Sequence, residues 1–147
     1  MSVPKEARGE QKFKVLIDAR KLAKYSINIL ASNKSFKTRQ TGNIEDDAIN
    51  PPQPELVSKM RDTAIDVYIS AFSANETVLT KSNYRHRRQL QDKSIAKCNE
   101  LLALVEMSIP IFHINSKRVK YWTSQIVCVR NQIQKWKESD YSRYRKM

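Results

Sequence analysis

The side chains that most often bind transition metals are scarce in this sequence, which has two histidines and two cysteines. Four-helix bundles with di-metal sites place a glutamate three positions before each ligating histidine. Here Asn83 stands at that position before His86, and Pro110 stands there before His113. With two glycines, the chain also has no glycine-rich phosphate loop. We therefore expect no metal site and no bound cofactor.

The two cysteines, Cys98 and Cys128, are the remaining candidates for covalent chemistry. Both lie in apolar helical patterns without CxxC spacing, which is typical of reduced thiols in the cytoplasm. Cys98 has no histidine near it in the sequence, so a buried structural thiol is favoured over a nucleophile. The residues predict a protein that binds or scaffolds and has no catalytic activity.

Arginine, lysine and tyrosine offer a different chemistry, because guanidinium groups match phosphate oxygens and tyrosine rings stack on exposed bases. The segment SNYRHRRQLQ combines three arginines with a tyrosine, and Tyr141 and Tyr144 are interleaved with basic residues near the C-terminus. Many bundles have basic exposed faces, so composition alone leaves a solubilising role open. The predicted nucleic-acid-binding residues are Arg85, Arg87, Arg88, Lys93, Lys117, Arg118, Lys120, Arg143, Arg145 and Lys146.

The positive charge is concentrated in the second half of the chain. Residues 1–80 have 12 Lys and Arg against 10 Asp and Glu, whereas residues 81–147 have 15 against 5, so +10 of the net +12 lies there. Such asymmetry favours an anionic partner, namely nucleic acid, a membrane surface or an acidic protein. The N-terminus lacks the apolar core of a signal peptide, and no run is long enough to span a bilayer, so we expect a cytoplasmic protein.

Apolar residues recur at three- and four-residue steps along four segments, which predicts four long helices. Short connections join the second helix to the third and the third to the fourth. The sequence therefore predicts one all-α domain over 1–147, an antiparallel up-and-down four-helix bundle. The expected helices are 5–31, 54–75, 82–109 and 116–139, with a long loop at 32–53 and a basic C-terminal tail at 140–147.

The core-facing residues of the last two helices determine which groups remain on the surface. In the fourth helix, the regular pattern predicts that Trp122 and Trp136 lie in the core. In the third helix, the pattern Ile95, Cys98, Leu102, Val105 and Ile109 predicts a core that ends near residue 94. The arginines of SNYRHRRQLQ would then remain exposed.

Several apolar residues fall outside these predicted core positions. A second buried surface between subunits would explain them, and so would a broad core stripe. The predicted oligomer-interface residues are Leu90, Leu101, Leu104, Tyr121 and Val127.

The second half of the chain resembles the Avd proteins, the accessory variability determinants of diversity-generating retroelements. These are similar in turn to four-helix-bundle proteins encoded in ribosomal RNA intervening sequences. The resemblance covers about residues 86–144, and KFKVLIDARKLAKY and RDTAIDVY extend it more loosely. Its most specific parts are Arg87-Arg88, Leu90-Gln91, Cys98, Glu100-Leu101-Leu102, Phe112-His113, Lys117-Arg118, Tyr121-Trp122, Trp136 and Ser139-Asp140.

This resemblance implies a non-enzymatic homopentamer that binds a reverse transcriptase and its template RNA, alone or in an RNA/DNA hybrid, and supports mutagenic copying. The alternative function is that of a free-standing protein of the intervening-sequence type with an RNA-related or unknown role. Two features depart from the family: the 32–53 loop is longer than expected, and Pro110 interrupts the end of the third helix.

Overall fold

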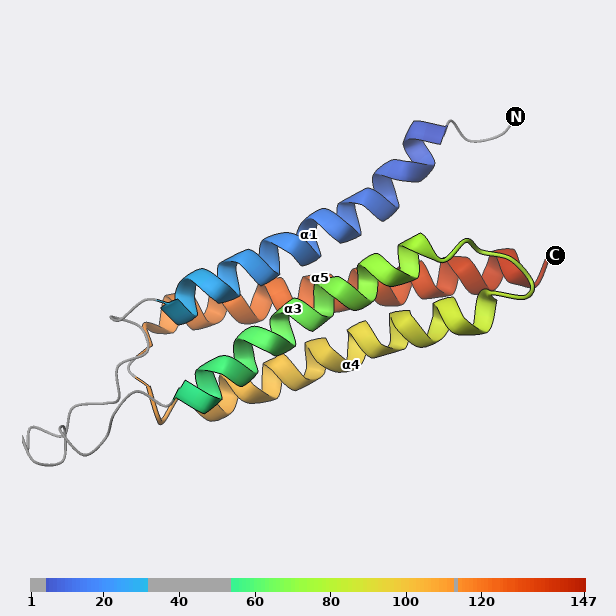
Figure 1. Cartoon of the computed structure of the whole chain (residues 1–147). Helices are drawn as coiled ribbons and strands as arrows, with labels where there is room; N and C mark the ends of the chain where they lie inside the picture. The colour runs from blue at the N-terminus through green and yellow to red at the C-terminus, as the bar shows by residue number, and fades with distance from the viewer. Residues whose placement is uncertain (1–4, 32–53, 113) are drawn as a thin grey trace, which may run out of the picture.

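The computed structural model describes residues 5–31, 54–112 and 114–147, with side chains from Lys14 onward. It is an all-α four-helix bundle, as the sequence predicted. The predicted loop at 32–53 and His113 lie outside the described residues. In Figure 1, sequential helices run in opposite directions, and α1 and α5 are also antiparallel. Each helix packs against two neighbours, in the circular order α1, α3, α4, α5.

Helices α1 (Lys5–Ala31) and α3 (Pro54–Glu76) form one side of the bundle. Pro54 begins α3, where its missing N–H and fixed φ suit the first helical turn. The buried residues of α3 run from Met60 to Ala74. In α1 the regular buried positions are Val15, Ala19, Leu22, Ser26 and Ile29.

Helices α4 (Tyr84–Ser108) and α5 (Ser116–Tyr144) form the other side. Asn115 caps α5, because its side chain accepts a hydrogen bond of 2.8 Å from the backbone N of Lys117. Trp122 and Trp136 are buried, with 0% and 6% of their surface exposed, which confirms their predicted place in the core.

The C-terminal boundary of α5 differs from the prediction. The helix does not end at residue 139 but continues to Tyr144, so most of the predicted tail is helical. Its core-facing positions extend past Trp136 to Asp140, which is 1% exposed. The apolar pattern in the sequence stops before Asp140 because this side chain is a carboxylate. In the folded helix, however, Asp140 occupies the next buried position.

The buried face of α4 is also rotated relative to the prediction. Cys98 and Val105 are buried as expected, but Ile109 is 39% exposed and Ile95 and Leu102 are only partly buried. The buried positions instead run regularly from one end of the helix to the other. They are Tyr84, Arg87, Gln91, Ser94, Cys98, Leu101, Val105 and Ser108.

Candidate nucleic-acid interface

Arg87 is a core residue, which corrects the prediction that it binds nucleic acid. It is 2% exposed and forms a two-point ion pair with Asp140 of α5. Its Nε donates to Asp140 Oδ2 at 2.6 Å, and its second terminal nitrogen donates to Oδ1 at 3.1 Å. The prediction failed because the buried face of α4 does not stop near residue 94 but continues with polar side chains.

The ion pair belongs to a polar layer that joins α4 to α5 and also contacts the residue that follows α3. Gln91 Nε2 donates to Asp140 Oδ2 at 2.8 Å, and Arg87 also donates to the carbonyl of Thr77 at 2.9 Å. The Arg87 guanidinium lies 5.1 Å from the ring centroid of Trp136. Its donors are therefore directed inward, and this arginine has a structural role. We name Arg87, Gln91 and Asp140 the polar layer.

The other basic residues at this end of the bundle face solvent. Because α4 and α5 are antiparallel, the first turns of α4 lie beside the last turns of α5 (Figure 1). Arg85, Arg143, Arg145 and Lys146 are exposed, and Arg88 is half-buried. Segments 81–92 and 135–147 together contain nine Lys and Arg residues against three Asp and Glu residues, a net charge of +6. Half of the chain's net charge of +12 is thus concentrated here.

An exposed aromatic ring lies among these cations. Tyr141 is 45% exposed, and the guanidinium carbons of Arg88 and Arg145 lie 5.8 Å and 5.7 Å from its ring centroid. We name Arg88, Tyr141 and Arg145 the Arg–Tyr cluster. Tyr84, in contrast, is 9% exposed and stacks on Tyr144, with ring centroids 3.9 Å apart and planes 7° apart. Of the three tyrosines singled out in the sequence, Tyr141 has the ring most available to a base.

The remaining predicted cations do not join this surface. Lys117, Arg118 and Lys120 are exposed at the other end of α5. At 1.5 Å per residue, Lys117 lies about 40 Å along the helix from Arg145. Lys93 is exposed, but five positions after Arg88 it lies on a different side of α4. The ten predicted residues therefore form separate groups, and the largest is at the α4–α5 end.

The predicted oligomer interface is wrong in part. Leu101 is 0% exposed in the core, and Leu90 and Leu104 are partly buried against that core. The rotation of α4 explains this result, because it moves these three leucines toward the other helices. Tyr121 is 53% exposed and Val127 is partly buried, so these two remain on the surface of α5.

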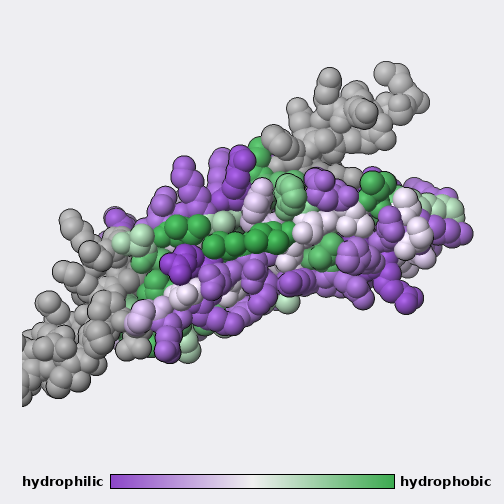
Figure 2. Space-filling model, in the orientation of Figure 1, coloured by the Kyte–Doolittle hydropathy of each residue, from purple (hydrophilic) through white to green (hydrophobic). Residues whose placement is uncertain are grey.

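Exposed apolar residues lie on the side of the bundle formed by α1 and α3. Ile27, Ile69 and Phe72 are 37%, 51% and 43% exposed, respectively. Ile65 and Tyr68 line a neighbouring groove of about 310 Å³ between α1 and α3. Figure 2 shows hydrophobic side chains along the middle of this face. We name Ile27, Ile65, Tyr68, Ile69 and Phe72 the α1–α3 stripe.

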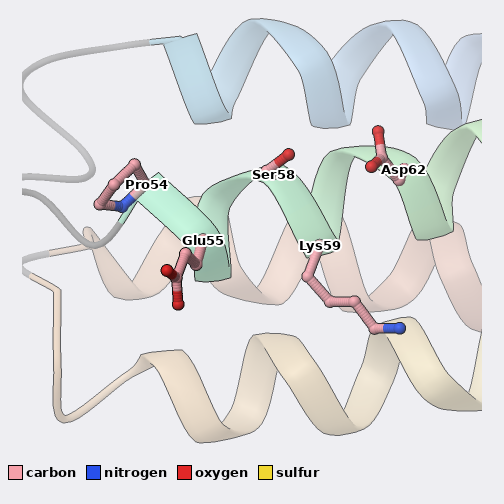
Figure 3. Close-up of a pocket in the computed structure, with 5 residues that line it drawn as sticks. All are labelled: Pro54, Glu55, Ser58, Lys59 and Asp62. Carbon is pink, nitrogen blue, oxygen red and sulfur yellow. The ribbon is translucent and has the colours of Figure 1, made fainter.

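A further hollow lies at the start of α3, lined by Pro54, Glu55, Ser58, Lys59 and Asp62. Figure 3 shows that their side chains diverge: Ser58 and Asp62 point toward α1, whereas Glu55 and Lys59 point toward α4. Lys59 forms an ion pair of 3.1 Å with Glu100. Polar groups that point in opposite directions do not converge on one ligand.

The two thiols lie in different environments. Cys98 is 0% exposed, and burial raises its pKa to about 12, so its thiolate population near neutral pH is negligible. Cys128 is exposed. Among residues 5–31, 54–112 and 114–147, no three His, Cys, Asp or Glu side chains are placed to hold a metal ion.

Comparisons with protein-family models, curated proteins and solved structures give no match to this chain. Within the part of the chain that the structure describes, no helix combines the length and apolar character needed to cross a membrane.

Proposed function

We propose that this protein is a non-enzymatic RNA-binding subunit that serves a diversity-generating retroelement, where it binds the reverse transcriptase and the template RNA. The observation that supports RNA binding is the Arg–Tyr cluster, an exposed ring with two guanidinium groups beside it, within a region of net charge +6. Guanidinium groups neutralise phosphates, and the ring stacks on an unpaired base. The retroelement setting rests on the resemblance of residues 86–144 to Avd proteins.

The alternative is the intervening-sequence type of bundle, which has the same fold without a retroelement. The two proposals predict the same fold but a different genomic location of the gene. A neighbouring reverse-transcriptase gene with a template repeat supports the retroelement role. Location of the gene within a large-subunit ribosomal RNA gene supports the alternative.

The RNA-binding proposal predicts a specific loss in a triple variant of the Arg–Tyr cluster, Arg88→Gln, Tyr141→Ala and Arg145→Gln. Removing one stacking platform should weaken single-stranded RNA binding by about tenfold or more. Removing two phosphate contacts should also flatten the slope of log affinity against log salt by roughly 1.4, since each contact contributes about 0.7 on single strands. Fluorescence anisotropy at several salt concentrations measures both effects.

The exposed face of α1 provides a matched control with the same loss of charge. Its variant is Arg20→Gln and Lys24→Gln, both at exposed positions. We expect this control to retain the wild-type affinity within about threefold and to keep more of the salt slope, because its cations lie far from Tyr141. Equal losses in the two variants would mean that binding follows net charge alone. Intact RNA binding with lost reverse-transcriptase association would assign the cluster to a protein contact.

Self-assembly is the second expectation of the resemblance, and we propose it with the pentamer as the expected form. Light scattering at micromolar concentration should give a mass several times that of one chain, and a monomer would contradict the proposal. The double variant Ile69→Ser and Phe72→Ser removes exposed apolar surface from the α1–α3 stripe. A smaller mass in this variant would place the stripe between subunits, whereas a smaller mass in Tyr121→Ser would place α5 there.

A further inference from the structure

A hollow of about 740 Å³ lies beside the Arg–Tyr cluster, between α4 and α5. From α5 it is lined by Gln134, Lys137, Glu138, Tyr141 and Ser142, and from α4 by Arg88. Gln134, Glu138 and Tyr141 are spaced by four and three positions, so they share one face of α5. An aromatic ring, a guanidinium and four further polar side chains therefore border one space.

One side of the hollow is held by an ion pair between the two helices. Lys137 Nζ lies 2.5 Å from Asp92 Oδ1 of α4, and the Lys137 side chain is 25% exposed. This contact occupies the lysine and links α4 to α5 beside the hollow. The lysine charge is thereby directed to Asp92 and away from the next residue of α5, Glu138.

Glu138 is the unexplained group of this hollow. Its carboxylate is exposed, and it has no hydrogen bond or ion pair with any of the described residues. It lies in a region of net charge +6, where a carboxylate weakens the attraction for phosphates. An ionised carboxylate accepts hydrogen bonds and cannot donate them. The Glu138 carboxylate would therefore fit a ligand that stacks on Tyr141 and presents hydrogen-bond donors at its edge.

We propose that this hollow binds one unpaired guanine of a single-stranded RNA. The base stacks on Tyr141 and the adjacent guanidinium of Arg88, which both offer flat faces. The Glu138 carboxylate accepts from guanine N1–H and the N2 amino group, two neighbouring donors on one edge. Adenine and cytosine present a single amino group beside an acceptor there, and uracil presents a single N–H between acceptors. The guanine must be unpaired, because pairing occupies that edge.

This inference rests on the proposed RNA binding and adds base selectivity to it. Its test uses single-stranded RNAs of identical, uridine-rich sequence with one central G, A or C, measured by fluorescence anisotropy. We expect the wild-type protein to bind the G-containing RNA about fivefold or more tightly than the others, the lower end of discrimination by a paired set of hydrogen bonds.

The informative variant is Glu138→Gln, which keeps the size of the side chain and replaces one acceptor oxygen with a donor. Its preference for guanine should fall to within about twofold, while its affinity for the A and C RNAs stays equal or rises as negative charge is lost. Glu106→Gln, at an exposed position near the other end of α4, removes the same charge and should keep the preference.

The outcomes separate the inference from the function on which it rests. RNA binding that depends on the Arg–Tyr cluster but shows no guanine preference would overturn the inference and leave the proposed function standing. A guanine preference that survives Glu138→Gln, or disappears equally in Glu106→Gln, would overturn it as well. Absence of all RNA binding would overturn both.

Discussion

Replacing Asp140 with asparagine should lower the free energy of unfolding by about 3–5 kcal/mol, the range for removing one partner of a buried ion pair. The reason is that Arg87 would keep its charge at 2% exposure without a carboxylate opposite it. Asparagine also keeps only one of the two acceptor oxygens. Either Gln91 and Arg87 Nε, or Arg143 and the second terminal nitrogen of Arg87, would therefore lose their acceptor. Urea denaturation followed by circular dichroism measures the change.

Two further variants test this explanation. Arg143 also donates to Asp140, at 2.8 Å, but its side chain is 44% exposed, so Arg143→Gln should cost less than about 1 kcal/mol. The triple variant Arg87→Met, Gln91→Leu and Asp140→Leu replaces the polar layer with apolar side chains. It should be more stable than Asp140→Asn, because no unpaired charge is buried. Equal stability of Asp140→Asn and wild type would show that the layer is not required for folding.

Replacing Trp122 with alanine should cost about 3–5 kcal/mol of stability, as expected for removing a large aromatic side chain from a core. Trp122 is 0% exposed, and its Nε1 donates to Ser26 Oγ of α1 at 2.8 Å. Ser26 donates in turn to the carbonyl of Leu22 at 2.7 Å. The variant therefore loses packing and one hydrogen bond between α1 and α5. Thermal and urea melts measure the loss.

The neighbouring residue Tyr121 supplies the control. It is 53% exposed, so Tyr121→Ala should change stability by less than about 1 kcal/mol, within the usual range for surface substitutions. Trp122→Phe should lie between the two, because it keeps a ring in the core but leaves Ser26 without its donor. A Trp122→Ala protein as stable as wild type would contradict the packing described for α5.

The sequence by itself determined the fold class and the order and approximate extent of the helices. A three- and four-residue spacing of apolar residues is a local property, and it persists along each helix. For α5 it also identified Trp122 and Trp136 as core residues, because every core-facing position before Asp140 is apolar.

The sequence did not determine which side of α4 is buried. Ile95, Cys98, Leu102, Val105 and Ile109 fit a helical stripe, but a second stripe shares Cys98 and Val105 with it. That second stripe runs through Ser94, Leu101 and Ser108 and is the one buried against the other helices. The two differ by one position, so hydrophobicity favoured the first stripe whereas packing chose the second.

The same rotation gives adjacent arginines different roles. Arg87 turns inward, where Asp140 and the carbonyl of Thr77 accept its hydrogen bonds, and Arg88 turns toward Tyr141 at the surface. Asp140 lies 53 positions from Arg87 in the sequence, and only the antiparallel packing of α4 and α5 brings them together. A charge is buried when its counter-charge is adjacent in space, and spacing along one helix does not contain that information. The sequence thus determined that this end of the bundle is basic, and the tertiary structure decided which of its arginines are available to a ligand.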